Sequence, residues 1–137
     1  MKLVKTILLK APRTHVWKFL TEADRLALWF HRGEKDLTGG GEWALVSNSL
    51  GKEGQRIGWG EVIVFEPPER LVHTFTLPRF DGVKTTCFWE LQEVAGGTIL
   101  TLTHEGLESL AADAFAVGSD FDKGWDEHFG RLRKVAA

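Results

Sequence analysis

Cysteine is almost absent from this sequence of 137 residues, in which Cys87 is the single example. One thiol forms no internal disulfide, and it cannot build a thiolate metal site by itself. The sequence therefore disfavours a disulfide-stapled secreted scaffold. It fits a reducing compartment, and we predict a cytoplasmic protein.

Long hydrophobic runs are also missing, although a helix that crosses a bilayer needs about 20 consecutive apolar residues. The apolar start of the chain is interrupted by Lys5 and ends at Lys10. This segment is too short for the core of a signal peptide, and it predicts a strand instead. We expect no stable membrane insertion.

Neither sign of charge is in excess, because 17 Lys and Arg residues oppose 19 Asp and Glu residues and the net charge is -2. Domains that bind nucleic acid or an anionic membrane usually carry a basic surface. We therefore predict no nucleic-acid partner.

Familiar catalytic and metal-binding motifs are lacking as well. The five histidines show neither HxxxH nor HxH spacing, and no serine lies in a GxSxG turn. The run Gly39–Gly41 is not followed by Lys-Ser or Lys-Thr, so it indicates a chain reversal and not a phosphate-binding loop. We predict no metal site, no cofactor and no assembled catalytic group.

The patterns that are present indicate an α+β fold. Residues 3–10 predict a strand, Pro12 the start of a helix, and Thr21 the N-cap of a second short helix. Alternating apolar residues separated by glycine and proline turns then predict consecutive antiparallel strands, near 43–45 and at 57–65, 71–77, 86–91 and 98–105.

A long C-terminal helix is predicted by apolar residues spaced three and four apart. Gly118 is expected to end the preceding segment, and Ser119–Asp120 to supply the N-cap of this helix. Its apolar stripe consists of Phe121, Trp125, His128, Phe129, Leu132 and Val135.

Short motifs spread over nearly the whole chain carry a family resemblance. In order they are Ala11-Pro12, Val16-Trp17, Trp29-Phe30, the triple glycine before Trp43, Gly60-Glu61-Val62, the turn from Pro67 to Leu71, the segment from Gly97 to Gly106, and Gly124-Trp125. Together they resemble the family of activators of the heat-shock-protein ATPase, within the START-like or SRPBCC superfamily. The resemblance implies a helix-grip fold, with a curved antiparallel sheet of six or seven strands around the C-terminal helix, two short helices after the first strand, and one domain over residues 1–137.

Such a fold must leave space beneath its helix. Six or seven strands at 4.8 Å spacing give a sheet about 30 Å wide, whereas one helix is about 10 to 12 Å across. Either large side chains or a ligand fill the remaining volume. Our candidate ligand lining, chosen by strand parity and helix stripe, is Trp29, Phe30, Trp43, Trp59, Phe75, Trp89, His104, Trp125 and Phe129.

Two features of this interior have alternative interpretations. Gly124 costs about 1 kcal/mol relative to alanine inside a helix, so we expect either close packing of the helix on the sheet, which we favour, or room beside Trp125. His104 and His128 both face the apolar interior. Each is either a core histidine with satisfied hydrogen bonds, which is the commoner case, or a polar contact or general base.

Three functions remain open. The first is binding of a small hydrophobic or amphipathic molecule between sheet and helix, with His104 as its polar contact. The second, which the resemblance implies, is binding of the heat-shock chaperone and stimulation of its ATPase. The third is an enzyme similar to the cyclases, dehydratases or hydrolases of the superfamily, although we favour a non-enzymatic role. Both a monomer and a homodimer are compatible with the sequence.

Overall fold

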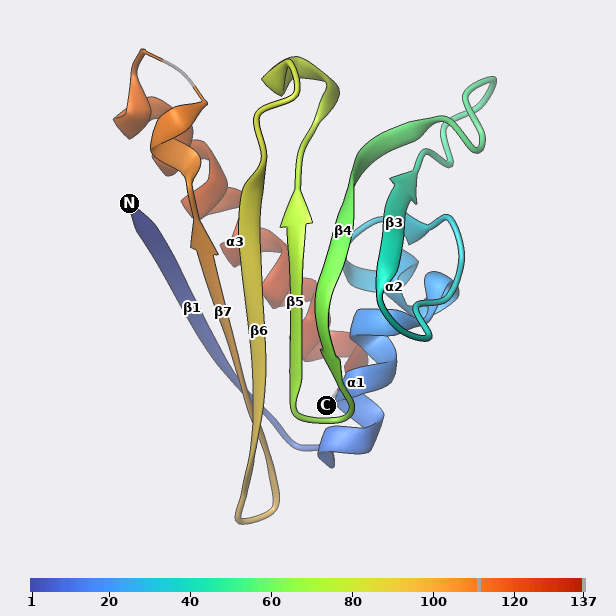
Figure 1. Cartoon of the computed structure of the whole chain (residues 1–137). Coiled ribbons are helices and arrows are strands. Elements are labelled where there is room, and N and C mark those ends of the chain that lie inside the picture. The colour runs from blue at the N-terminus through green and yellow to red at the C-terminus, as the bar shows by residue number, and fades with distance from the viewer. Residues whose placement is uncertain (111, 137) are drawn as a thin grey trace.

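A computed structural model describes residues 1–110 and 112–136 (Figure 1). In chain order its elements are β1 (Lys2–Leu9), α1 (Arg13–Thr21), α2 (Ala23–Trp29), β2 (Arg32–Gly33), β3 (Gly41–Val46), β4 (Arg56–Glu66), β5 (Arg70–Phe75), the 3₁₀ turn η1 (Pro78–Phe80), β6 (Thr85–Val94), β7 (Gly97–Glu105), the 3₁₀ turn η2 (Leu107–Ser109) and α3 (Ala114–Ala136).

Seven antiparallel strands form one sheet in the order β1-β7-β6-β5-β4-β3-β2. The long helix α3 crosses one face of this sheet, and α1 and α2 lie beside it on the same face (Figure 1). The predicted α+β helix-grip fold is therefore confirmed. Pairing of β1 with β7 places the first strand beside the last one. This side of the sheet therefore joins segments that are about 100 residues apart in the sequence.

Alternation along the strands decides which side chains face α3. In β7, Thr98, Leu100, Leu102 and His104 are buried, while the residues between them are only partly buried. This is the period of two that a strand imposes, and it confirms that His104 faces the helix. On the inner face His104 lies next to Cys87 of β6, which in turn lies next to His73 of β5.

Aromatic rings fill the centre of the space between sheet and helix. The ring centroids of Trp29 and Trp89 are 6.1 Å apart, and those of Trp89 and Trp125 are 5.6 Å apart, both in edge-to-face contact. Phe129 continues the cluster one turn along α3, 6.3 Å from Trp125. These contacts, favoured by the quadrupoles of the rings, leave little empty volume below the middle of α3.

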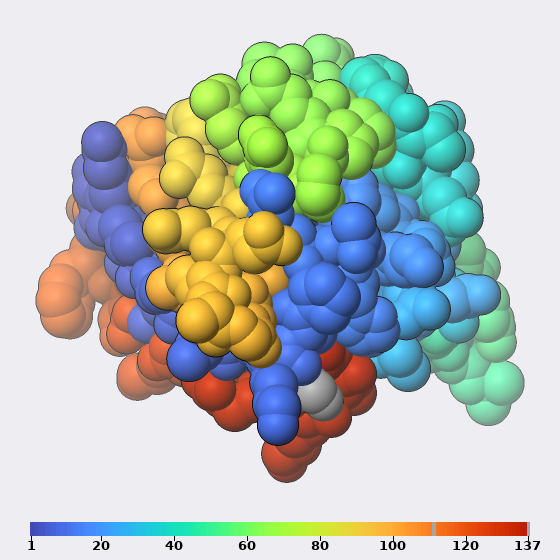
Figure 2. All heavy atoms as spheres, turned by 90° about the horizontal axis from the view of Figure 1, so that it is seen from below, coloured from blue at the N-terminus to red at the C-terminus, as the bar shows by residue number. Residues whose placement is uncertain are grey.

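One end of the molecule is covered by chain turns. Side chains of α1, of the β4–β5 turn and of the β6–β7 turn meet over this end, beside the last turns of α3 (Figure 2). The turn η1 and the first turns of α3 lie at the opposite end of the molecule (Figure 1).

Polar contacts fasten α3 to the edge strand β1. The Lys5 ammonium lies 2.5 Å from Asp122 and 2.8 Å from Asp126, and the Arg133 guanidinium donates to the carbonyl of Leu8 at 3.2 Å. An inward-facing lysine on an edge strand also discourages pairing with another chain.

The predicted start of α3 was wrong. The helix begins at Ala114, and the carboxylate of Asp113 accepts a hydrogen bond from the backbone N–H of Ala116 at 3.0 Å. Gly118 lies buried inside the helix, where the side chain of Met1 occupies the place of its missing Cβ, and so it does not end a segment. The apolar stripe also ends differently, since Val135 is 38% exposed and Ala136 only 2%.

Two further details differ from the predictions. Thr21 is the last residue of α1, not a cap of α2, and its hydroxyl donates to the carbonyl of Trp17. Glu22 precedes α2 in its place. The short strand β2 was not predicted, because two residues are too few to show alternation. It adds the seventh strand to the sheet by pairing with β3.

Candidate functional site

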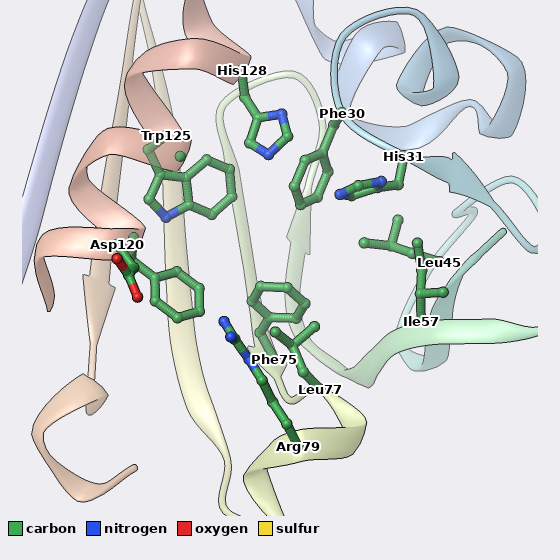
Figure 3. Close-up of a pocket in the computed structure, with 12 residues that line it drawn as sticks. Phe30, His31, Leu45, Ile57, Phe75, Leu77, Arg79, Asp120, Trp125 and His128 are labelled. Atoms are coloured by element: carbon green, nitrogen blue, oxygen red, sulfur yellow. The ribbon is translucent and has the colours of Figure 1, made fainter. Parts of the chain in front are cut away.

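A pocket of about 200 Å³ opens between the first half of α3 and the neighbouring ends of β4 and β5 (Figure 3). We call it the α3 pocket. Its walls are mostly apolar, and they are formed by Phe30, Leu45, Ile57, Phe75, Leu77, Phe121 and Trp125. Polar groups are added by His31, Arg79, Asp120 and His128, and the remaining lining residue is Gly124.

Gly124 helps to keep this volume open. A Cβ atom built on it would meet no other heavy atom of the described residues within 4 Å, so there is space next to this turn of α3. The interpretation that we favoured from sequence, close packing of the helix on the sheet at Gly124, is therefore wrong. Gly58 of β4 has the opposite surroundings, because its Cβ would lie 2.9 Å from the Phe75 ring that forms the pocket floor.

Three of the nine predicted lining residues, Phe30, Phe75 and Trp125, reach the α3 pocket. They come from the end of α2, from β5 and from α3, and Figure 3 shows them directed toward one space. The structure adds His31 and Arg79, which the strand and helix patterns could not place there, since His31 lies between α2 and β2 and Arg79 lies in the turn after β5.

Three other predicted residues line a separate and much smaller space. Trp29, Trp43 and Trp89 surround a volume of about 20 Å³, which is enough for one water molecule. Their role is to fill the core.

The last three predicted residues line neither of these two spaces. Phe129 and His104 are buried in the core. Trp59 lies beside Ala44 and Thr76 in the sheet, and it alternates with the buried inner residues Gly58 and Gly60. Trp59 therefore lies on the outer face, away from α3.

Hydrogen bonds to the indole N–H groups indicate that the core tryptophans are structural. Trp29 donates to the carbonyl of Phe19 at 2.9 Å, and Trp43 donates to the carbonyl of Thr74 at 3.0 Å. Trp89 donates to His73, and Trp125 donates to His104. Each buried N–H thus has a partner within the protein, as burial of a polar group requires.

His104 has both ring nitrogens occupied. Its Nδ1 accepts from the indole of Trp125 at 3.1 Å, and its Nε2 lies 2.7 Å from the hydroxyl of Thr85, which itself donates to the carbonyl of Phe75 at 2.8 Å. A single arrangement, with the proton on Nε2, satisfies all three contacts. Burial, and to a lesser degree His73, lowers the pKa of His104 to about 3, so the ring is neutral at physiological pH.

His73 forms a second pair of this kind. Its Nε2 accepts from the indole of Trp89 at 2.9 Å, and its Nδ1 donates to the carbonyl of Thr74 at 2.9 Å. Burial lowers the pKa of His73 to about 4. His104 thus joins β7 to Trp125 of α3, His73 joins β5 to Trp89 of the neighbouring strand β6, and neither neutral imidazole has a free nitrogen.

His31 and His128 form the polar end of the α3 pocket, with ring centroids 5.4 Å apart. Burial is the largest cause of the lowered pKa of His128, about 4, and the nearby His31 and Arg131 lower it as well. Burial followed by the charge of Arg131 lowers the pKa of His31. Both rings are therefore uncharged near neutral pH.

A sequence model of the family described as Activator of Hsp90 ATPase homolog 1-like protein matches residues 10–137. The chain belongs to this family. The resemblance inferred from its motifs is thus confirmed. Among curated proteins no match is found.

Solved structures share the fold of this family member over nearly its whole length. CalU16 from Micromonospora echinospora is 24% identical, with a TM-score of 0.72, over 96% of this chain and 73% of that one. An HSP90 activator from Plasmodium falciparum is 21% identical, with a TM-score of 0.77, over 98% and 95%. The Aha1 dimer from Colwellia psychrerythraea is 16% identical, with a TM-score of 0.76, over 99% and 96%. Similarity at these identities shows the fold alone.

In residues 1–110 and 112–136, no group of three or more His, Cys, Asp or Glu side chains is placed to hold a metal ion. Among the helices of the same residues, none combines the length and the apolar character that crossing a bilayer requires.

Proposed function

We propose that this member of the Activator of Hsp90 ATPase homolog 1-like family binds a small apolar or amphipathic molecule in the α3 pocket. The observation that carries the proposal is the open space next to Gly124, bordered by aromatic and aliphatic side chains. A dry cavity of about 150 Å³ is enough to bind benzene. The volume of about 200 Å³ therefore suits a compound of one or two rings that extends partly toward solvent.

The ligand contacts that we propose differ from those inferred from sequence. Phe30, Phe75 and Trp125 remain, because they line the open volume. The polar contact moves from His104 to the histidines of the pocket, since both nitrogens of His104 have partners in the protein.

Native mass spectrometry of freshly purified protein tests this function. A retained small molecule is expected on the wild type and on Gly130→Leu, but not on Gly124→Leu, whose side chain would occupy the pocket. Gly130 is the matched control because it lies on the exposed side of the same helix, where an added Cβ also meets nothing within 4 Å. An adduct of equal intensity on all three proteins would place the molecule elsewhere.

A second function, stimulation of an Hsp90 ATPase, is supported by family membership and by the shared fold with the Plasmodium falciparum activator. It predicts that purified chain accelerates ATP hydrolysis by the Hsp90 of the same cell. An unchanged rate, together with no association in a pull-down, would contradict it. An enzymatic role for His104 gains no support from geometry, because the ring is buried and both of its nitrogens are bonded.

A further inference from the structure

Arg131 determines which nitrogen of His128 carries the proton. Its Nη2 lies 2.5 Å from His128 Nδ1, and its Nε donates to the carbonyl of Trp29 at 3.1 Å. A guanidinium has donors and no acceptor, so His128 Nδ1 must be the acceptor of this contact. The carbonyl of Trp29 also lies 3.2 Å from Nδ1, but Nδ1 cannot donate to it while its lone pair accepts from Nη2 of Arg131. The proton of the neutral ring is therefore on Nε2.

The Nε2–H group of His128 is presented to the α3 pocket. In Figure 3 the ring extends from α3 into the space between Trp125 and Phe30, with one nitrogen directed into the pocket. Phe30 packs edge-to-face against it at 4.8 Å, and Trp125 does so at 5.8 Å. Within the described part of the chain, Nε2 makes no hydrogen bond. A donor without a partner beside apolar walls favours a ligand that can satisfy it.

We propose that the ligand of the α3 pocket is an apolar ring compound with a hydrogen-bond acceptor oxygen, and that His128 Nε2–H binds this oxygen. The inference deepens the proposed function and rests on it. Because Arg131 occupies Nδ1, His128 offers a donor and no lone pair toward the pocket, so it selects an acceptor such as a carbonyl over a hydrogen-bond donor. His31 faces the same space, but no described contact fixes its proton.

Two probes of nearly equal shape test the selection. In 2-acetylnaphthalene a ketone replaces the alkene of 2-isopropenylnaphthalene, so the two compounds differ mainly in the acceptor oxygen. By calorimetric titration we expect the wild type to bind the ketone roughly three- to tenfold more tightly, the usual net value of one hydrogen bond. In His128→Phe, which keeps a ring but loses the N–H, the preference should disappear while the alkene still binds.

A second pair of measurements separates a specific role of His128 from a structural one. Nitrogen NMR of the ring should show the proton on Nε2 in the wild type and a mixture of tautomers in Arg131→Met, with a reduced preference for the ketone. The matched control is Arg133→Met, which removes another guanidinium of α3 that lies outside the pocket lining and donates to the carbonyl of Leu8. This variant should keep both the tautomer and the preference.

The outcomes distinguish binding in the α3 pocket from recognition of an acceptor oxygen by His128. If both probes bind equally and Gly124→Leu abolishes binding, the pocket is a binding site but the inference about the acceptor is wrong. If the preference survives in His128→Phe and is lost in Arg79→Met, the oxygen is bound by Arg79, and the inference is again wrong. If neither probe binds, the inference falls together with the proposed function.

Discussion

Trp125 and His104 share a hydrogen bond of 3.1 Å that joins α3 to the sheet in the middle of the core. His104 also donates to the hydroxyl of Thr85, which in turn donates to the carbonyl of Phe75. Since Trp125 and Phe75 both line the α3 pocket, this buried chain holds two of its walls at a fixed separation.

Replacing His104 by leucine should destabilise the protein by about 2 kcal/mol. The substitution leaves the Trp125 N–H buried without a partner, and such a group costs about 1 to 3 kcal/mol. Urea unfolding measures the difference. Adding Trp125→Phe to the variant removes the stranded donor, so the double mutant should lose less than the sum of the two single changes. Strict additivity would show that the bond contributes nothing.

Acid should destabilise the fold between about pH 6.5 and pH 4. His73, His104 and His128 have a lowered pKa of about 4, 3 and 4 in the folded protein. In this interval the unfolded chain binds protons that the folded chain does not, so stability is fully present above pH 6.5 and falls as the pH decreases. Each fully buried histidine contributes a slope of up to about 1.4 kcal/mol per pH unit. His128, which is partly exposed, contributes less.

The measurement is the free energy of unfolding at pH 7, 6 and 5. In His104→Leu the slope should become smaller, because one of the groups that titrate on unfolding is gone. Leu102→Val, a change at a buried residue of the same strand face that removes no titratable group, serves as the control that should keep the wild-type slope. Equal slopes in the wild type and in His104→Leu would refute the assignment.

Alanine at two glycines should have opposite effects. At Gly60 of β4 a Cβ would lie 2.0 Å from the carbonyl oxygen of Thr74, so the pairing of β4 with β5 must shift, at about 3 kcal/mol. At Gly130 the Cβ has open space, and alanine should stabilise α3 by up to about 1 kcal/mol. Thermal unfolding compares the two, and a Gly60→Ala protein as stable as the wild type would contradict the geometry.

The fold could be predicted from sequence because local patterns and global packing agree. Alternation placed His104 on the inner face of β7, and the three-four spacing placed Trp125 and Phe129 on the sheet-facing side of α3. Trp59 could not be placed in this way, because its neighbours Gly58 and Gly60 have no side chains whose polarity would reveal the parity of the strand.

The position of the pocket was beyond a pattern analysis. Aromatic side chains were expected either to fill the interior or to line a cavity, and they do both at different places. Trp89 and Phe129 pack closely in the centre, while the volume beside Gly124 stays open. The contact between Arg131 and His128 depends on rotamers and on the path of α3 over the sheet, which periodicity alone does not determine.

Ligand-dependent stability tests the central claim most directly. The free energy of unfolding of the wild type, Gly124→Leu and Gly130→Leu is measured with and without 2-acetylnaphthalene. At a concentration of 100 times its Kd, the probe should stabilise the wild type and Gly130→Leu by about 2.7 kcal/mol and leave Gly124→Leu unchanged. Equal stabilisation of all three proteins, or of none, would contradict a binding pocket beneath the first half of α3.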